Sequence, residues 1–174
     1  MWTTLAKSVK IVEPATYSYL PKPDAAVLDQ FEMSHGMKLP ETYREFAKLF
    51  GAGELGEYYR IAVPLCVADD YGLQEYNQGW QKAMKIWEDS VPRESVPRML
   101  FFAGTIGGES YAWDTGDCRD PVSCEHAIYL LPRDGPAVIV AESFLSFVQQ
   151  CVAGTAPGIG KLRIRRVFSR FVQT

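Results

Sequence analysis

The spacing of hydrophobic and polar residues along this 174-residue chain changes about halfway from mainly helical to mainly strand-like. Residues 99–103 are apolar on both faces, which predicts a strand deep in a sheet. A glycine-containing loop follows, and residues 109–114 then alternate, with Tyr111 and Trp113 on one face and Asp114 on the other. Two such runs joined through glycine predict a β-hairpin. We expect one of the two aromatic side chains to be core and the other to lie at a partly exposed edge.

Three helices are predicted before this hairpin. Asp24 is placed to accept a hydrogen bond from the first turn of the first helix, and Gly36 to end that helix. The pair Asp69-Asp70 precedes a longer apolar stripe and is expected to cap the third helix. The helices cover residues 25–35, 40–50 and about 71–88, and residues 54–66 between the second and the third form one strand or two short ones.

The chain after the hairpin predicts a second hairpin and one more helix. Residues 115–125 are polar and are expected to form a surface loop. Strands at 127–131 and 137–140 are joined by a turn at Gly135, and a helix follows over residues 142–152. The alternating residues 161–172 fit either a strand or a short helix. Hairpin-linked strands with helices at both ends predict a single-domain α+β fold with a mainly antiparallel sheet of about six strands.

Charge is distributed unevenly along the chain. The net charge is −3, but the 14 residues from position 161 onward carry five Lys or Arg and no acid, so the main body is acidic. A general nucleic-acid surface needs a basic footprint, so we expect no nucleic-acid partner. An acidic body instead suits a basic protein partner. No apolar run is long enough to span a membrane, and scattered cysteines favour a reduced, cytoplasmic protein.

Candidate chemistry centres on His126. Cys118 and Cys124 lie close to it in sequence, but five residues separate the two cysteines, and this trio lacks the fourth ligand of a closed zinc site. We therefore expect no metal and no cofactor. A small hydrolase that uses His126 with nearby acids such as Asp114 and Asp117 is kept as an alternative, although no strained nucleophile turn surrounds Ser110. No catalytic residue is assigned.

Three segments, in order, resemble the SUKH superfamily, whose namesake is a yeast regulator of cell-wall synthesis. They are Leu39-Pro40 with Tyr43, Phe46 and the Gly51-Ala52-Gly53 ending; the hairpin from Leu100 to Asp114; and Ile128-Tyr129 followed by Val138 and the helix near Phe144 and Phe147. The resemblance covers about residues 24–152. It implies a twisted mixed sheet with flanking helices, no catalytic residues, and in many bacterial members an immunity protein that binds and neutralises a toxin. Residues 1–23 then form an N-terminal extension, and residues 153–174 a basic segment packed on the same domain.

The hypothesis that follows is a cytoplasmic protein-binding module, most simply a bacterial immunity protein that occludes a cognate toxin, for example a basic nuclease. Aromatic side chains would supply most of the binding energy and acids would speed association. The expected contacts are Glu109, Tyr111, Trp113, Asp114, Asp117 and Asp120, with Asp69 and Asp70 nearby if the long helix starts at the same edge. A second alternative is a regulatory scaffold that docks partners through residues 161–174.

Overall fold

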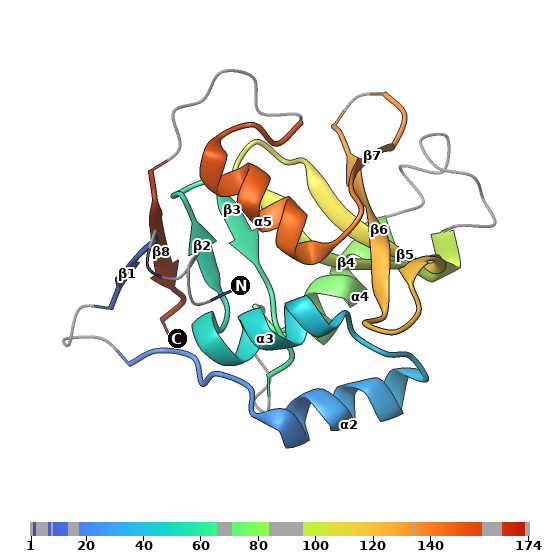
Figure 1. Ribbon diagram of the computed structural model, residues 1–174, viewed down its shortest axis with the longest axis horizontal. Coiled ribbons are helices and arrows are strands. Elements are labelled where there is room, and N and C mark those ends of the chain that lie inside the picture. Colours follow the sequence, from blue (N-terminus) through green and yellow to red (C-terminus); the bar gives the residue numbers. More distant parts are fainter. Residues whose placement is uncertain are drawn as a thin grey trace.

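The fold consists of one eight-stranded mixed sheet with helices packed on its faces (Figure 1). The expected α+β class is therefore confirmed, and the sheet has two more strands than the sequence predicts. The computed structural model describes residues 2, 7, 9–13, 18–65, 71–83, 96–133, 135–157 and 165–172. Its strands are β1 (Lys10–Val12), β2 (Gly53–Leu55), β3 (Tyr59–Ile61), β4 (Met99–Thr105), β5 (Ser110–Asp120), β6 (Glu125–Leu131), β7 (Val138–Ala141) and β8 (Val167–Arg170). Its helices are α2 (Ala25–His35), α3 (Glu41–Phe50), α4 (Leu73–Ala83) and α5 (Phe144–Ala153), with a short 3-10 turn at Val96–Arg98.

The strand order is β1-β8-β2-β3-β4-β5-β6-β7, and of the pairings between these described strands only β1–β8 is parallel. The ambiguous C-terminal stretch therefore supplies a strand, β8, between the first strand of the chain and β2. Phe168 of β8 is fully buried. Arg170 lies over the ring of Tyr19 and forms an ion pair with Glu13 at 3.1 Å. The described part of the basic segment is thus built into the sheet, and deleting it would remove a strand.

Local signals place the first helix correctly. The Asp24 carboxylate accepts a hydrogen bond from the backbone N–H of Val27 at 2.9 Å, and Gly36 ends α2 with a left-handed φ of 62°. The third predicted helix starts at Leu73, later than expected, because Leu73 N–H is held by the carbonyl of Val63 at 2.9 Å. The expected cap Asp69-Asp70 and the predicted end of that helix lie outside the described residues.

The prediction of a surface loop over residues 115–125 is wrong. β5 continues to Asp120 and pairs with β6, which begins at Glu125, so this stretch is the outer part of a long hairpin. β4 pairs with β5 only as far as Asp114, and beyond that point β6 is the strand paired with β5. With polar side chains on both faces, the outer strand shows no hydrophobic alternation, which is the signal that sequence reasoning relies on. We call residues 115–125 the β5–β6 arm.

The main core lies between one face of the sheet and helices α3 and α5 (Figure 1). Trp113 is fully buried there, stacked on Phe102 with ring centroids 3.9 Å apart and contacted edge-on by Tyr43 at 4.8 Å. Helix α4 covers the other face of the central strands, where Trp80 stacks on Phe101 at 5.4 Å. This division follows from the apolar run of β4, whose side chains point alternately to the two faces.

Glu125, at the start of β6, caps two helices with one buried carboxylate. Its Oε1 accepts hydrogen bonds from the Thr42 hydroxyl at 2.6 Å and the Thr42 N–H at 3.2 Å, in the first turn of α3. Its Oε2 accepts the N–H of Phe144, the first residue of α5, at 2.9 Å. Pro40, which precedes α3, has no side-chain cap to offer. A negative charge suits the positive end of each helix, so Glu125 fixes both helices to the sheet.

We therefore expect Glu125→Ala to lower the free energy of unfolding by about 3 kcal/mol, because it orphans N–H donors at two helix ends. Glu125→Gln keeps acceptor capacity on one oxygen only and is expected to lose about half as much. Urea denaturation followed by circular dichroism measures both. Glu45→Ala, an exposed acid on α3, is the control and should stay within about 0.5 kcal/mol of the parent. Equal stabilities of the Glu125 and Glu45 variants would contradict the double-cap assignment.

Candidate protein-binding surface

The β5–β6 arm ends in a tight turn that rests on the start of α3. Asp120 closes the turn by accepting hydrogen bonds from Val122 N–H at 3.0 Å and from the Ser123 hydroxyl at 2.6 Å. These hydrogen bonds lower the pKa of the Asp120 carboxyl, and the bond from the Ser123 hydroxyl has the largest effect. The carbonyl of Ser123 accepts the Glu41 N–H at 2.9 Å, and Val122 at the tip is 91 % exposed. The arm is therefore an ordered projection that presents its tip to solvent.

Acids predominate on the outer side of the arm. Arg119 forms ion pairs with Asp117 at 2.7 Å and with Glu142 at 3.2 Å, and Asp117 also accepts the Tyr129 hydroxyl at 3.2 Å. Asp120 is exposed. One arginine thus stands among three carboxylates, and the arm keeps a net negative charge.

Both aromatic residues named among the expected partner contacts are buried, whereas the sequence analysis expects one of them to lie at a partly exposed edge. Tyr111 is 1 % exposed and Trp113 is 0 % exposed, so neither side chain can touch a partner in this structure. Both point from β5 toward the core face, because they share one side of a strand that α5 covers. The expectation that one of the two side chains lies at a partly exposed edge is therefore wrong.

Asp114 is also buried, and its charge is used within the fold. Arg98 donates to both of its carboxylate oxygens, from Nε and from Nη2, each at 3.0 Å. The Gly116 N–H adds a third hydrogen bond at 2.9 Å. Through these bonds Asp114 joins β5 to the residue that precedes β4. Its side chain is 6 % exposed, so little of it is accessible to a partner.

The remaining expected contacts do not lie together. Glu109 lies at the far end of the β4–β5 hairpin and is bonded to the Thr105 hydroxyl. Asp117 lies eight residue steps further along the strand, which is roughly 26 Å at about 3.3 Å per residue. Asp69 and Asp70 lie outside the described residues. Of the predicted contacts that the structure describes, Asp117 and Asp120 share one surface.

His126 lies in β6, near the base of the arm. Its side chain is buried, and register places it opposite Cys118. Burial lowers the pKa of His126, against the opposing effect of the nearby Glu125, Asp114 and Asp117 carboxylates. With 8 % of the residue exposed, the ring offers little surface to a substrate. Among the described residues no group of three or more His, Cys, Asp or Glu is placed to hold a metal ion.

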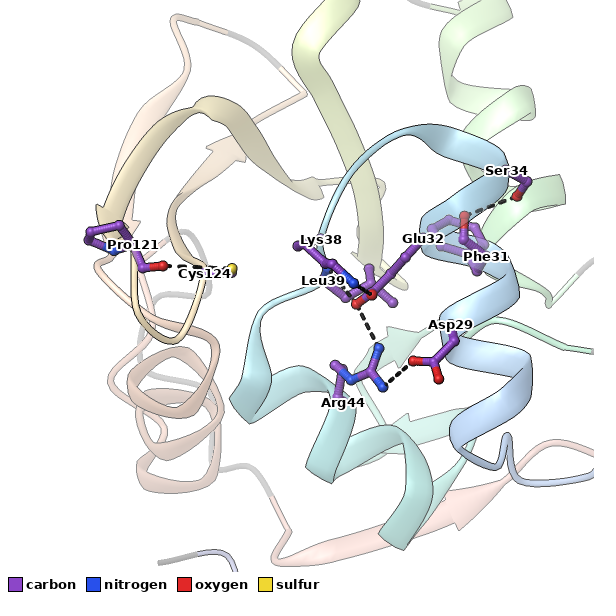
Figure 2. Close-up of polar contacts among 9 residues, drawn as sticks. All are labelled: Asp29, Phe31, Glu32, Ser34, Lys38, Leu39, Arg44, Pro121 and Cys124. Carbon is purple, nitrogen blue, oxygen red and sulfur yellow. Dashed lines mark hydrogen bonds and ion pairs between the residues drawn. The ribbon is translucent and has the colours of Figure 1, made fainter.

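A cleft that the sequence analysis did not single out lies beside the arm tip (Figure 2). It has a volume of about 340 Å³. Helices α2 and α3 form one wall, and the turn that carries Cys124 forms the other (Figure 2). We call it the α2–α3 cleft; it is lined by Asp29, Glu32, Lys38, Leu39, Glu41, Arg44, Val122, Ser123 and Cys124.

The carboxylate of Glu32 is the buried charge that joins the residues lining this cleft. Its side chain is 3 % exposed and accepts hydrogen bonds from Lys38 Nζ at 2.7 Å, Leu39 N–H at 3.0 Å and Arg44 Nη1 at 2.6 Å (Figure 2). Arg44 also reaches Asp29 at 2.7 Å. Burial raises the pKa of Glu32, but the three hydrogen bonds and the Arg44 charge outweigh it, and the net shift is downward. The sequence contained one signal for this buried carboxylate: Glu32 lies four residues after Leu28, on the apolar stripe of α2.

We expect Glu32→Gln to lower the free energy of unfolding by about 2 kcal/mol at pH 7, because a charge-assisted network becomes neutral at its centre. The folded-state pKa lies below the ordinary 4.5, so the parent's advantage is complete above pH 4.5 and is lost as pH falls through the folded pKa. Thermal unfolding from pH 3 to pH 8 measures this. The matched control is Asp29→Asn, which alters an exposed partner of the same Arg44 and should cost under about 1 kcal/mol. A stability gap that is unchanged at pH 3 would refute the assignment.

Comparison with known proteins agrees with the geometry. The profile of the SMI1 / KNR4 family (SUKH-1) matches residues 22–150, which span α2 through most of α5. Neither curated proteins nor solved structures give a significant match. No helix in the described part of the chain is long and apolar enough to cross a membrane. The match covers well over half of the sequence, and the chain belongs to the SMI1 / KNR4 family (SUKH-1).

Proposed function

We propose that this chain is a non-catalytic protein-binding module, and that it acts in the bacterial cytoplasm as an immunity protein that neutralises a cognate toxin by covering it. The observation that carries the proposal is family membership over residues 22–150. Its geometric support is the β5–β6 arm, an ordered projection with exposed acids and an exposed apolar tip.

The arm suits a basic partner such as a nuclease. Asp117, Asp120 and Glu142 attract positive charge, and such attraction mainly speeds association. Val122 at the tip can enter an apolar recess of the partner, and the α2–α3 cleft beside it can receive a basic side chain near Asp29 and Glu41. The wider proposal that Glu109, Asp69 and Asp70 also contact the partner would require a second contact region, because Glu109 lies at the other end of β5.

The two alternatives have weaker geometric support. A hydrolase built on His126 needs an open pocket around that ring, whereas His126 is buried, with 8 % of the residue exposed. A scaffold that docks through residues 161–174 needs a separable tail, whereas Val167–Arg170 form a strand of the sheet. Deleting the segment would unfold part of the sheet and could not test docking.

The test is binding to a toxin encoded beside this gene, measured as co-purification and as growth protection. The double variant Asp117→Asn/Asp120→Asn should slow association about tenfold at low salt, with a smaller effect at 0.5 M salt, where charges are screened. At position 120, Asn keeps one oxygen to accept the Val122 N–H, and its NH₂ group can donate to the Ser123 hydroxyl oxygen, so the arm should stay folded.

The matched control is Glu13→Gln/Glu57→Gln. It removes two negative charges, as the arm variant does, from exposed glutamates near β1 and in the β2–β3 turn, away from the arm. Its association rate should stay within about twofold of the parent. If the neighbouring toxin does not bind at all, the proposed function is wrong. If both double variants slow binding equally, the arm is not the contact and only net charge matters.

A further inference from the structure

A second surface, independent of the arm, lies where α4 begins. A cavity of about 200 Å³ opens there between α4, β3 and the residue that follows β8. It is lined by Arg60, Ala62, Tyr71, Tyr76 and Phe171. Pockets for drug-sized ligands hold about 300–1,000 Å³, so this one is the size of a single large side chain.

The walls of this aromatic pocket are held by main-chain hydrogen bonds. Gly72 bridges to Val63 in the parallel sense, which fixes the start of α4 against the end of β3. The N–H of Phe171 donates to Ala52 at 3.1 Å, and its carbonyl accepts the Leu20 N–H at 3.0 Å. A site whose walls are fixed in this way loses little conformational entropy when it is filled.

The rings favour an aromatic occupant. Tyr71 and Phe171 stack with centroids 4.2 Å apart and form one continuous wall. Tyr76, in the first turn of α4, adds a third ring. Aromatic rings pack best on other rings, and single aromatic side chains buried in preformed pockets supply much of the energy of protein interfaces.

Arg60 sets the charge of the occupant. It is the one charged residue in the lining, and its Nε donates to Glu54 across the β2–β3 pair at 2.9 Å. Its side chain is 55 % exposed, so the guanidinium lies at the mouth of the pocket. A planar guanidinium binds carboxylates in a defined geometry, and it disfavours the cation that an aromatic cage would otherwise attract.

We propose that this pocket binds one aromatic side chain of a partner protein, with an adjacent acidic residue that pairs with Arg60. The partner segment is therefore aromatic and acidic, unlike the basic surface that the arm would attract. The pocket lies beside α4 and β3, whereas the arm belongs to β5 and β6, so the two surfaces can be occupied independently.

The experiment titrates the full chain, labelled with nitrogen-15, with three blocked tetrapeptides whose central pairs are Phe-Asp, Phe-Lys and Ala-Asp. The Phe-Asp peptide should shift the amide signals of Ala62, Gly72 and Phe171 at millimolar concentration. The Phe-Lys and Ala-Asp peptides should bind at least about fivefold more weakly, since each lacks one recognised group. Free phenylacetate is titrated in parallel.

Arg60→Gln should weaken binding of the Phe-Asp peptide about tenfold, because the charge-assisted contact is lost. The matched control is Arg165→Gln, an exposed arginine paired with Glu57 outside the pocket, and it should leave that affinity unchanged. Equal binding of Phe-Asp and Phe-Lys, equal effects of the two arginine variants, or no shift at the pocket would overturn the proposal. Phenylacetate binding as tightly as the Phe-Asp peptide would assign the pocket to free small molecules instead. Toxin binding through the arm is measured in the separate experiment with the Asp117 and Asp120 variants, so the result of one experiment does not decide the other.

Discussion

The Glu125 carboxylate makes the contacts on which the position of the proposed binding surface depends. It bonds Thr42 of α3 and Phe144 of α5, so two helices are fixed to one strand end. The start of α3 in turn donates Glu41 N–H to the tip of the β5–β6 arm. The arm is thus held at its base by the sheet and at its tip by a helix that Glu125 anchors. The buried carboxylate supplies the side-chain cap that Pro40 cannot give α3, and it supplements the Ser143 hydroxyl, which accepts the Ser146 N–H at the start of α5.

The acids of this chain divide into two groups by burial. Glu32, Asp114 and Glu125 are almost fully buried and accept three hydrogen bonds or more each, so their removal would leave buried donors or cations without partners. Asp117 and Asp120 lie at the surface, where an ion pair contributes roughly 0–1 kcal/mol. The fold gains little from the charge of the exposed pair, whereas a basic partner gains in association rate. That contrast favours a binding role for the arm acids over a structural one.

The sequence predicted what local chemistry determines and missed what depends on distant contacts. Asp24 and Gly36 define α2 through bonds to their own neighbours, so its bounds could be predicted. β8 is a strand only because β1 and β2 lie on either side of it, and these pairings span more than 100 residues. Period-two alternation placed Tyr111 and Trp113 on one face, but the helix that buries that face, α5, comes 30 residues later. The acid at position 32 was overlooked because its partners Lys38 and Arg44 come from the next loop and helix.

The two proposed surfaces differ in how each would hold a partner. The arm offers exposed acids and a single apolar tip, a combination that attracts from a distance but buries little apolar area. The aromatic pocket offers three rings and one arginine in a recess of about 200 Å³, which attracts weakly at a distance but can desolvate one side chain fully. Association rate and residence time are set by these two kinds of contact respectively. A partner that engages the arm alone is therefore expected to depend strongly on salt, whereas one that fills the pocket should be held largely by apolar burial, with a smaller salt-dependent part from Arg60.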